Sequence, residues 1–171
     1  MTEEYRTITG RQRAYTWEDP RTSAALVGSR SGLEMLQAVA HGELGGAPIA
    51  ATLGMSNLEV EEGRVAFGLT PDEWHYNPIG SVHGGVHATL LDSVMGCAVH
   101  SKLGAGQAYT TLDLNVRYLR PVTMTSGQLR AEGRIVSMGS RVATAEGTIT
   151  DGAGRLVATG STTCLIMTVA P

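Results

Sequence analysis

The sequence predicts a single α+β domain, built from one long central helix and five or six antiparallel strands. Two observations lead to this fold class. The segment from His83 to Ser101 contains no proline and carries a broad apolar face, whereas the part of the chain after it repeatedly alternates apolar and polar residues. A length of 171 residues suits one domain with a sizeable core.

The first 22 residues are predicted to be a leader, followed by a domain over residues 23–171. The leader mixes charges, threonines and three aromatic residues without a helical or strand period, so we expect it to become ordered only by docking. A short amphipathic helix is predicted from Ser31, which would be its N-cap, with Glu34 at the third helical position and Gly42 near the end.

Strands are predicted both before and after the long helix in the sequence. Residues 48–71 indicate two strands around the turn at residues 61–63. Residues 108–121 alternate strictly, with Leu112 and Leu114 on one face and Thr111 and Asp113 on the other. Residues 127–167 predict three more strands, separated by turns at 138–140 and 151–154.

The long helix, predicted over residues 83–101, would be about 28 Å long. Its apolar arc contains Leu90, Leu91, Val94, Met95, Cys97 and Ala98. Asp92 lies just beyond this arc, on a strip of small residues, and no Lys or Arg stands three or four positions away. Because burial of a lone carboxylate is costly, Asp92 is a candidate functional group; the alternative is a structural acid satisfied by a hydroxyl or a backbone N–H.

The start of the same helix is a candidate binding site for an oxyanion. Gly84 and Gly85 let the chain enter the first turn without side chains, which leaves backbone N–H groups available. An N–H placed against a developing oxyanion is typically worth about 3 kcal/mol of activation free energy. The alternative is a glycine pair that only permits close packing.

These motifs together resemble a known family. The pattern N-P-x-G-x-x-H-G-G, then L-L-D, then TTLDLNVRYLRPV, is similar to that of the hotdog-fold acyl-CoA thioesterases of the phenylacetate-pathway (PaaI-like) type. The similarity runs from about residue 31 to residue 168. It implies an antiparallel sheet wrapped around a long central helix, a homodimer with two active sites at the interface, and hydrolysis of an acyl-CoA to a free acid and coenzyme A. Whether two dimers pair into a tetramer stays open.

The resemblance also implies roles for individual residues. Asp92 would be the catalytic carboxylate, acting as a general base on water or as a nucleophile on the carbonyl carbon. The Gly84 N–H would bind the oxyanion, with Gly85 beside it. Asn77 would orient the carbonyl or the water, and His83 would stand at the helix start.

A hydroxyl on the following strand is a further expected component. Some relatives have a hydroxyl that faces the acid from the other subunit, and Thr111 matches its place. One extra residue in the preceding loop makes Thr110 the substitute candidate.

Coenzyme A is polyanionic and the chain has a net charge of −3, so the cations that bind its phosphates must be local. Guanidinium groups bind phosphate well. The candidate cations are Arg117, Arg120, Arg134 and Arg141. Arg141 and the neighbouring Ser140, a further candidate for substrate binding, lie in a segment that resembles the family hairpin that meets the nucleotide and pantetheine.

Other functions are disfavoured. The charge gives no reason to expect nucleic-acid or membrane binding, and no stretch of 18 apolar residues is present. His83 and His87 could chelate zinc only with a third ligand, and none has suitable spacing, so we expect no metal and no cofactor beyond the coenzyme A of the substrate. Cys97 and Cys164 do not form a disulfide framework, which favours the cytoplasm.

Two alternatives remain within the resemblance. A hotdog dehydratase or hydratase is disfavoured because its D-x-x-x-x-H segment is missing. A non-catalytic acyl-CoA-binding protein is disfavoured because the first thirty residues lack a DNA-binding pattern. The acyl group, aromatic or medium-chain, is not determined by the sequence.

Overall fold

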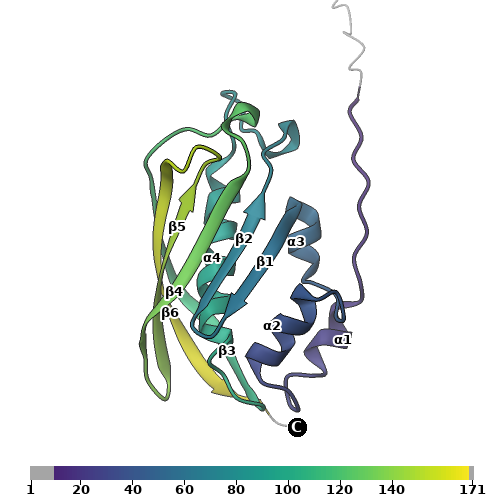
Figure 1. Ribbon diagram of the computed structural model, residues 1–171, viewed down its shortest axis with the longest axis vertical. Coiled ribbons are helices and arrows are strands. Elements are labelled where there is room, and N and C mark those ends of the chain that lie inside the picture. The colour runs from purple at the N-terminus through teal and green to yellow at the C-terminus, as the bar shows by residue number, and fades with distance from the viewer. Residues whose placement is uncertain (1–9, 170–171) are drawn as a thin grey trace, which may run out of the picture.

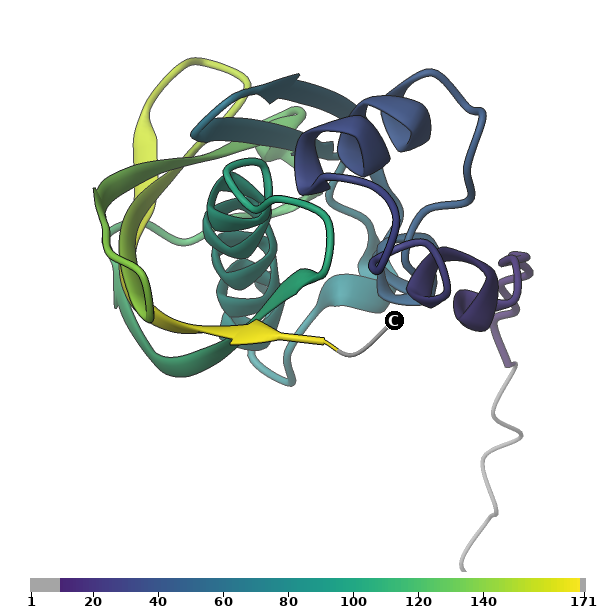
Figure 2. The same ribbon diagram turned by 90° about the horizontal axis from the view of Figure 1, so that it is seen from below.

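A long helix at the centre of a curved antiparallel sheet dominates the computed structural model, which describes residues 10–169 (Figures 1 and 2). This helix, α4, spans Gly84–His100 and matches the predicted segment to within one residue at each end. The strands are β1 (Met55–Glu61), β2 (Arg64–Leu69), β3 (Gln107–Tyr118), β4 (Leu129–Met138), β5 (Val142–Thr150) and β6 (Leu156–Thr168). Their order is β1-β2-β4-β5-β6-β3, with every neighbouring pair antiparallel. The predicted α+β class is confirmed.

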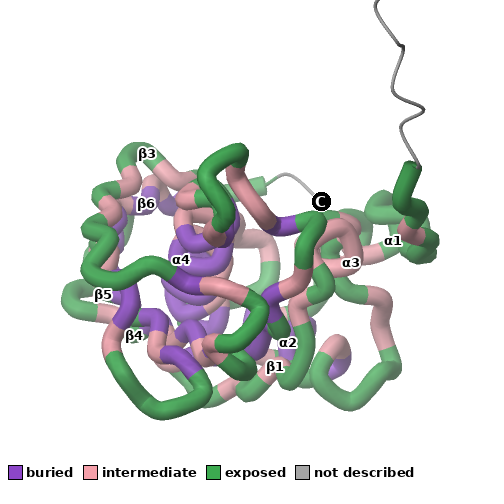
Figure 3. The backbone as a smooth tube through the Cα atoms, turned by 90° about the horizontal axis from the view of Figure 1, so that it is seen from above, coloured by how far each residue is buried: buried purple, intermediate pink, exposed green. Residues whose placement is uncertain are grey.

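Helix α4 is buried along most of its circumference (Figure 3). Leu90, Leu91, Val94 and Met95 are inaccessible to solvent and form the centre of the core. Fully burying one such side chain contributes about 1.5–3 kcal/mol, so this helix holds the sheet in its curved shape. Within residues 10–169, no helix is both long and apolar enough to cross a membrane.

A row of three glycines brings α4 unusually close to the sheet. Gly133, Gly147 and Gly160 lie side by side on β4, β5 and β6. A Cβ atom on Gly133 would stand 2.5 Å from the carbonyl carbon of Val94, and one on Gly147 or Gly160 would press on side chains of the helix. The row therefore sets how deeply α4 sits in the sheet.

The N-terminal half differs from the prediction in one element. Helix α2 (Gly32–Ala40) has the predicted capping box, in which Ser31 and Glu34 exchange hydrogen bonds. Residues 48–53, predicted to be strand, instead form helix α3 (Pro48–Leu53). Proline at its first turn, helix-forming alanines and a left-handed Gly54 (φ 70°) at its end explain the correction.

The predicted boundary between leader and domain, between residues 22 and 23, lies within a short helix. Residues 1–9 of the leader lie outside the described residues. Residues 10–19 have no regular structure, and a short helix α1 (Pro20–Ala24) crosses the predicted boundary between residues 22 and 23.

Strand β3 forms the edge of the sheet and does not alternate strictly. Thr111 pairs with Cys164 and Asp113 pairs with Thr163 on β6, so Leu112 is an extra residue in a bulge. The bulge turns Leu112 outward, where it is 57% exposed. Side chains on both sides of the bulge, Thr111 and Leu114, consequently face α4, although the sequence pattern placed them on opposite faces.

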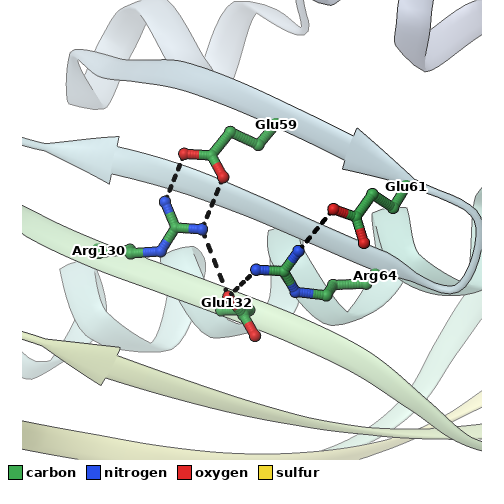
Figure 4. A network of polar contacts seen from close by, with 5 residues as sticks. All are labelled: Glu59, Glu61, Arg64, Arg130 and Glu132. Carbon is green, nitrogen blue, oxygen red and sulfur yellow. Dashed lines mark hydrogen bonds and ion pairs between the residues drawn. The ribbon is translucent and has the colours of Figure 1, made fainter.

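A network of ion pairs crosses β1, β2 and β4 on the outer face of the sheet (Figure 4). Arg130 donates to Glu59 (2.7 Å) and Glu132 (3.4 Å), and Arg64 donates to Glu132 (2.8 Å) and Glu61 (2.9 Å). The arginine partners hold the pKa of the Glu59 and Glu132 carboxyls below their ordinary values. These groups are partly exposed, so the network favours the strand register more than it adds stability.

Candidate active site

Asp92 is half-buried on α4 and has one polar partner. Its Oδ1 atom accepts a hydrogen bond of 2.9 Å from the hydroxyl of Thr111. Within residues 10–169 it forms no ion pair with any Lys or Arg. A carboxylate that is oriented by a neutral donor and not neutralised by a cation is available for chemistry with a ligand.

The hydroxyl of Thr111 belongs to the same chain as the acid that it contacts. The resemblance led to the expectation that this hydroxyl faces the acid of another subunit; within one chain, it contacts Asp92 of its own α4. The bulge at Leu112 is the physical reason, because it turns Thr111 toward α4 of its own chain. Thr110, the substitute candidate, is exposed.

The start of α4 leaves one particular N–H group available. His83 is the N-cap residue, and its Nδ1 atom accepts a hydrogen bond of 2.9 Å from the N–H of Gly85. The N–H of Val86 donates to the carbonyl of His83. The N–H of Gly84 has no acceptor among residues 10–169. Of the two glycines singled out from the sequence, Gly84 is thus the free donor and Gly85 is capped.

Tyr118 joins this group of residues, although the sequence did not single it out. Its hydroxyl donates to the carbonyl oxygen of Gly84 (3.1 Å), and its ring lies directly against the Gly84 Cα. The alternation of residues 108–121 did place Tyr118 on the face of Leu114, so the signal was present. Together with Arg120, these residues line a cavity of about 300 Å³ at the helix start.

His87 lines the same cavity and is almost completely buried. It is 4% exposed, packs edge-on against Tyr118, and its two ring nitrogens have no hydrogen-bond partner among the described residues. Burial lowers its pKa, so the ring is neutral at pH 7. His83 is occupied by capping, and residues 10–169 contain no group of three His, Cys, Asp or Glu side chains placed to hold a metal ion.

Asn77 is occupied within its own loop. Its side-chain oxygen accepts from the N–H groups of Ile79 and Ser81, and its side-chain nitrogen donates to the Ser81 hydroxyl. These contacts fix the Asn77 side chain within the loop that leads into α4.

The two cysteines are unpaired and poorly suited to act as nucleophiles. Burial, together with the negative charge of Asp92, raises the pKa of the Cys97 thiol to about 12. Burial also raises the pKa of Cys164. A thiol of this kind stays protonated near neutral pH and is a poor nucleophile.

Of the candidate arginines, only Arg120 lies at the start of α4, where it lines the cavity beside Gly84. Its guanidinium also donates to the carbonyl of Leu156. Arg117 and Arg134 lie on the outer face of the sheet and line a different hollow there. In one chain, the structure therefore does not bring Arg117 or Arg134 near Asp92, because their strand positions point away from α4.

Ser140 and Arg141 lie in the β4–β5 hairpin, toward the other end of α4 (Figure 1). The end of α4 lies beside the β1–β2 turn, because the Ser101 hydroxyl accepts a hydrogen bond from the N–H of Gly63. The carbonyl of Gly63 accepts from the N–H of Ile135 on β4, and β4 continues from Ile135 to the hairpin. Within one chain, the hairpin and the Gly84 cavity are thus at opposite ends of the helix.

Three comparisons bear on this arrangement. The thioesterase superfamily matches residues 79–158, which include α4, the strands β3, β4 and β5, and the first residues of β6. A protein of Halobacterium salinarum whose name suggests an esterase is 48% identical over 69 residues, which are 39% of this chain and 44% of that protein. The proofreading thioesterase EntH of Klebsiella pneumoniae is 29% identical over 107 residues, or 63% of this chain and 77% of EntH.

A solved structure covers more of the chain. The phenylacetic acid degradation-related protein of Ralstonia eutropha is 30% identical, with a TM-score of 0.69, and the match covers 76% of this chain and 98% of that one. The resemblance inferred from the motifs is confirmed, and so is the hotdog arrangement of sheet and helix.

Proposed function

This chain belongs to the thioesterase superfamily, and on that premise we propose that it hydrolyses acyl-CoA thioesters to a free acid and coenzyme A. The observation that carries the proposal is the state of Asp92. It is held by the Thr111 hydroxyl at 2.9 Å and has no cationic partner among residues 10–169. Such a carboxylate either removes a proton from the attacking water or attacks the carbonyl carbon itself.

The free N–H of Gly84 supports a role in stabilising the oxyanion. It stands at the first position of α4, where the helix dipole favours negative charge. Tyr118 and His83 engage the neighbouring backbone groups and fix the geometry of this turn. The Gly84 N–H is therefore a preorganised donor for the carbonyl oxygen of a thioester.

The separation of these two groups favours a site made by two copies of the chain. Asp92 follows Gly84 by eight residues, a rise of about 12 Å along α4. A reacting carbonyl needs both groups at about 3 Å. Gly84 of one copy and Asp92 of a second copy would satisfy this requirement.

The edge strand β3 offers the means of pairing. It has a neighbour, β6, on one side only. Thr111 marks the position of Asp92 along β3, and Tyr118 marks the position of Gly84. A two-fold axis midway between Thr111 and Tyr118, near Leu114, would set Thr111 of one copy opposite Tyr118 of the other. This pairing would bring Asp92 of one copy close to Gly84 of the other.

Arg120 is the best-placed cation for a phosphate of coenzyme A, because it shares the cavity with Gly84. The reaction needs no cofactor other than the coenzyme A carried by the substrate. The unpaired, protonated thiols suit a reducing cytoplasm. The acyl group is aromatic or medium-chain.

The direct test measures release of free thiol from benzoyl-CoA and hexanoyl-CoA with a thiol-reactive dye. We expect turnover by the native protein and loss of most of it in Asp92→Asn, which keeps the size of the side chain. A hydratase or a binding protein would release no thiol. Near-native rates in folded Asp92→Asn protein would defeat the assignment of Asp92.

A complementation experiment tests the two-copy site. Gly84→Pro removes the N–H at the first helical position, where proline is tolerated. A mixed dimer of Gly84→Pro and Asp92→Asn chains contains one site with neither defect, so it should regain activity that each homodimer lacks. If one chain supplies both groups, every site in the mixture is defective and no activity returns.

A further inference from the structure

The segment before α1 docks on the body of the protein, and one of its side chains is partly buried there. We call residues 10–19 the strap; in Figure 1 it runs alongside α3. Arg13 is the only half-buried residue in the strap, and all the others are exposed. The order of this segment therefore depends largely on what Arg13 contacts.

Arg13 joins two elements that are separate in the sequence. Its guanidinium donates to the carbonyls of Ala51 (3.0 Å) and Thr52 at the end of α3. The same group lies over the ring of Trp74, 4.7 Å from its centre, in the 3-10 helix η1 (Glu73–His75). Carbonyls at a helix end and aromatic faces both attract a cation, so Arg13 clamps α3 to η1.

Other contacts of the strap and of η1 point the same way. Arg11 pairs with Glu73 of η1 (2.8 Å). The Arg13 guanidinium also lies over the ring of Tyr15, 4.8 Å from its centre. Buried His75 of η1 forms a hydrogen bond of 2.9 Å to the carbonyl of Leu53. Arg13 and His75 thus both contribute to the contact between α3 and η1.

The junction continues directly into the start of α4. The carbonyl of His75 accepts a hydrogen bond of 2.7 Å from the N–H of His83, the N-cap of α4. Tyr76 and Val82 form a β-bridge between these two residues. A displacement of η1 would therefore be passed to His83 and to the adjoining N–H of Gly84.

We infer that Arg13 is a positioning residue for the Gly84 N–H, acting through η1 and the N-cap of α4. This inference rests on the proposed function, in which that N–H stabilises the oxyanion. The strap contributes no atom to the reaction. It holds the donor at the place where the charge develops, and a misplacement of 1 Å can cost about 10²-fold in rate.

The test compares Arg13→Met with Arg13→Lys and with Arg21→Met. Lysine keeps the charge of Arg13 but loses the planar fork that contacts two carbonyls and stacks on Trp74. Among residues 10–169, the Arg21 side chain pairs only with Asp19, so Arg21→Met serves as the matched control. Amide hydrogen exchange of residues 75–85 and steady-state kinetics are measured for all three proteins in the full-length chain.

We expect faster exchange of the His83 amide in both Arg13 variants, and a fall in kcat on the order of tenfold with KM little changed. Arg21→Met should match the native protein in both measurements. Unchanged exchange at residues 75–85 in the Arg13 variants overturns the inference. So does exchange that rises equally throughout α4, because Arg13 would then stabilise the whole fold and not this junction.

The exchange measurement separates this inference from the proposed function. If the native protein releases no thiol from any acyl-CoA, the proposed activity fails. The coupling of Arg13 to the His83 amide is still decided by exchange alone.

Discussion

Replacing Gly133 by alanine tests whether the glycine row positions α4, the helix that carries Asp92. The new Cβ would stand 2.5 Å from the carbonyl carbon and oxygen of Val94 and 2.6 Å from the nitrogen of Met95. These are backbone atoms of α4 and cannot rotate away. Strand β4 and the helix must therefore separate at this point.

The magnitude follows from the distances. Ordinary contacts begin at 3.4 Å, so the separation required is about 0.9 Å, the difference between 3.4 and 2.5 Å. Overpacking of a core costs about 1–3 kcal/mol, and a rigid obstacle places Gly133→Ala at the upper end. A loss of about 3 kcal/mol lowers the melting temperature by roughly 6–12 °C for a domain of this size.

Two controls make the test specific. On Gly147, in the same row, a Cβ meets flexible side-chain atoms of Met95 and Leu91 at 3.0 and 3.1 Å, so Gly147→Ala should cost less. On Gly104 the nearest atom is 3.6 Å away, and Gly104→Ala should change stability by less than about 0.5 kcal/mol.

Urea denaturation gives the free energy of unfolding, and thiol release gives the rate. We expect Gly133→Ala to lose both, because Asp92 moves with the helix away from Thr111. Equal unfolding free energies for Gly133→Ala and Gly147→Ala would refute the reasoning that the helix backbone is the obstacle.

Two further predictions concern single polar groups. Thr111→Val removes the hydrogen-bond donor to Asp92, and a hydrogen bond to a charged group is worth about 1.5–3 kcal/mol, so kcat/KM should fall by roughly 10- to 100-fold. Thr110 is exposed, and Thr110→Val should leave kcat/KM unchanged. Equal losses in the two variants would contradict the contact between Thr111 and Asp92. The pKa of buried His87 is lowered, so the unfolded chain takes up a proton below its ordinary value of 6.5 while the folded protein does not, and the free energy of unfolding falls as the pH drops. The free energy of unfolding is measured by urea denaturation between about pH 7.5 and pH 5, where His87→Leu should lose less stability than the native protein. His41 is exposed, and His41→Gln should lose as much stability as the native protein. Identical losses in all three proteins would exclude His87 as a source of acid sensitivity.

The groups that sequence alone identified were those whose signals are local. Asp92 stood out because no Lys or Arg is within one helical turn, which is a matter of spacing along the chain. Gly84 stood out because a glycine pair precedes an apolar helix. Both inferences need only the helical period, and α4 follows that period from its first residue to its last.

Short apolar segments were harder to assign. Residues 48–53 are too few to show a helical period, and the apolar run suits a strand equally well. The assignment is decided by Pro48 and by the left-handed Gly54, which are local signals, and by packing of α3 beside β1, which is not.

The orientation of strand residues depends on contacts across the sheet. With strict alternation, Thr111 would face away from Asp92. The extra residue Leu112 in the bulge turns the Thr111 side chain to the face of the sheet that packs on α4. The bulge accommodates the pairing of β3 with β6, fifty residues later in the chain, and no pattern within residues 107–118 reports it.

Chemistry and position are therefore encoded differently in this chain. The carboxylate of Asp92 and the N–H of Gly84 can be found from their own neighbours in sequence. The position of Asp92 depends on Gly133, which is 41 residues away, and the position of the Gly84 N–H depends on Arg13, which is 71 residues away. Neither positioning residue contacts the proposed substrate site. It follows that variants of Gly133 and Arg13 should lower the rate without altering which acyl-CoA is preferred, since the walls of the binding cavity stay the same. A change of acyl preference in either variant would mean that these residues shape the cavity itself.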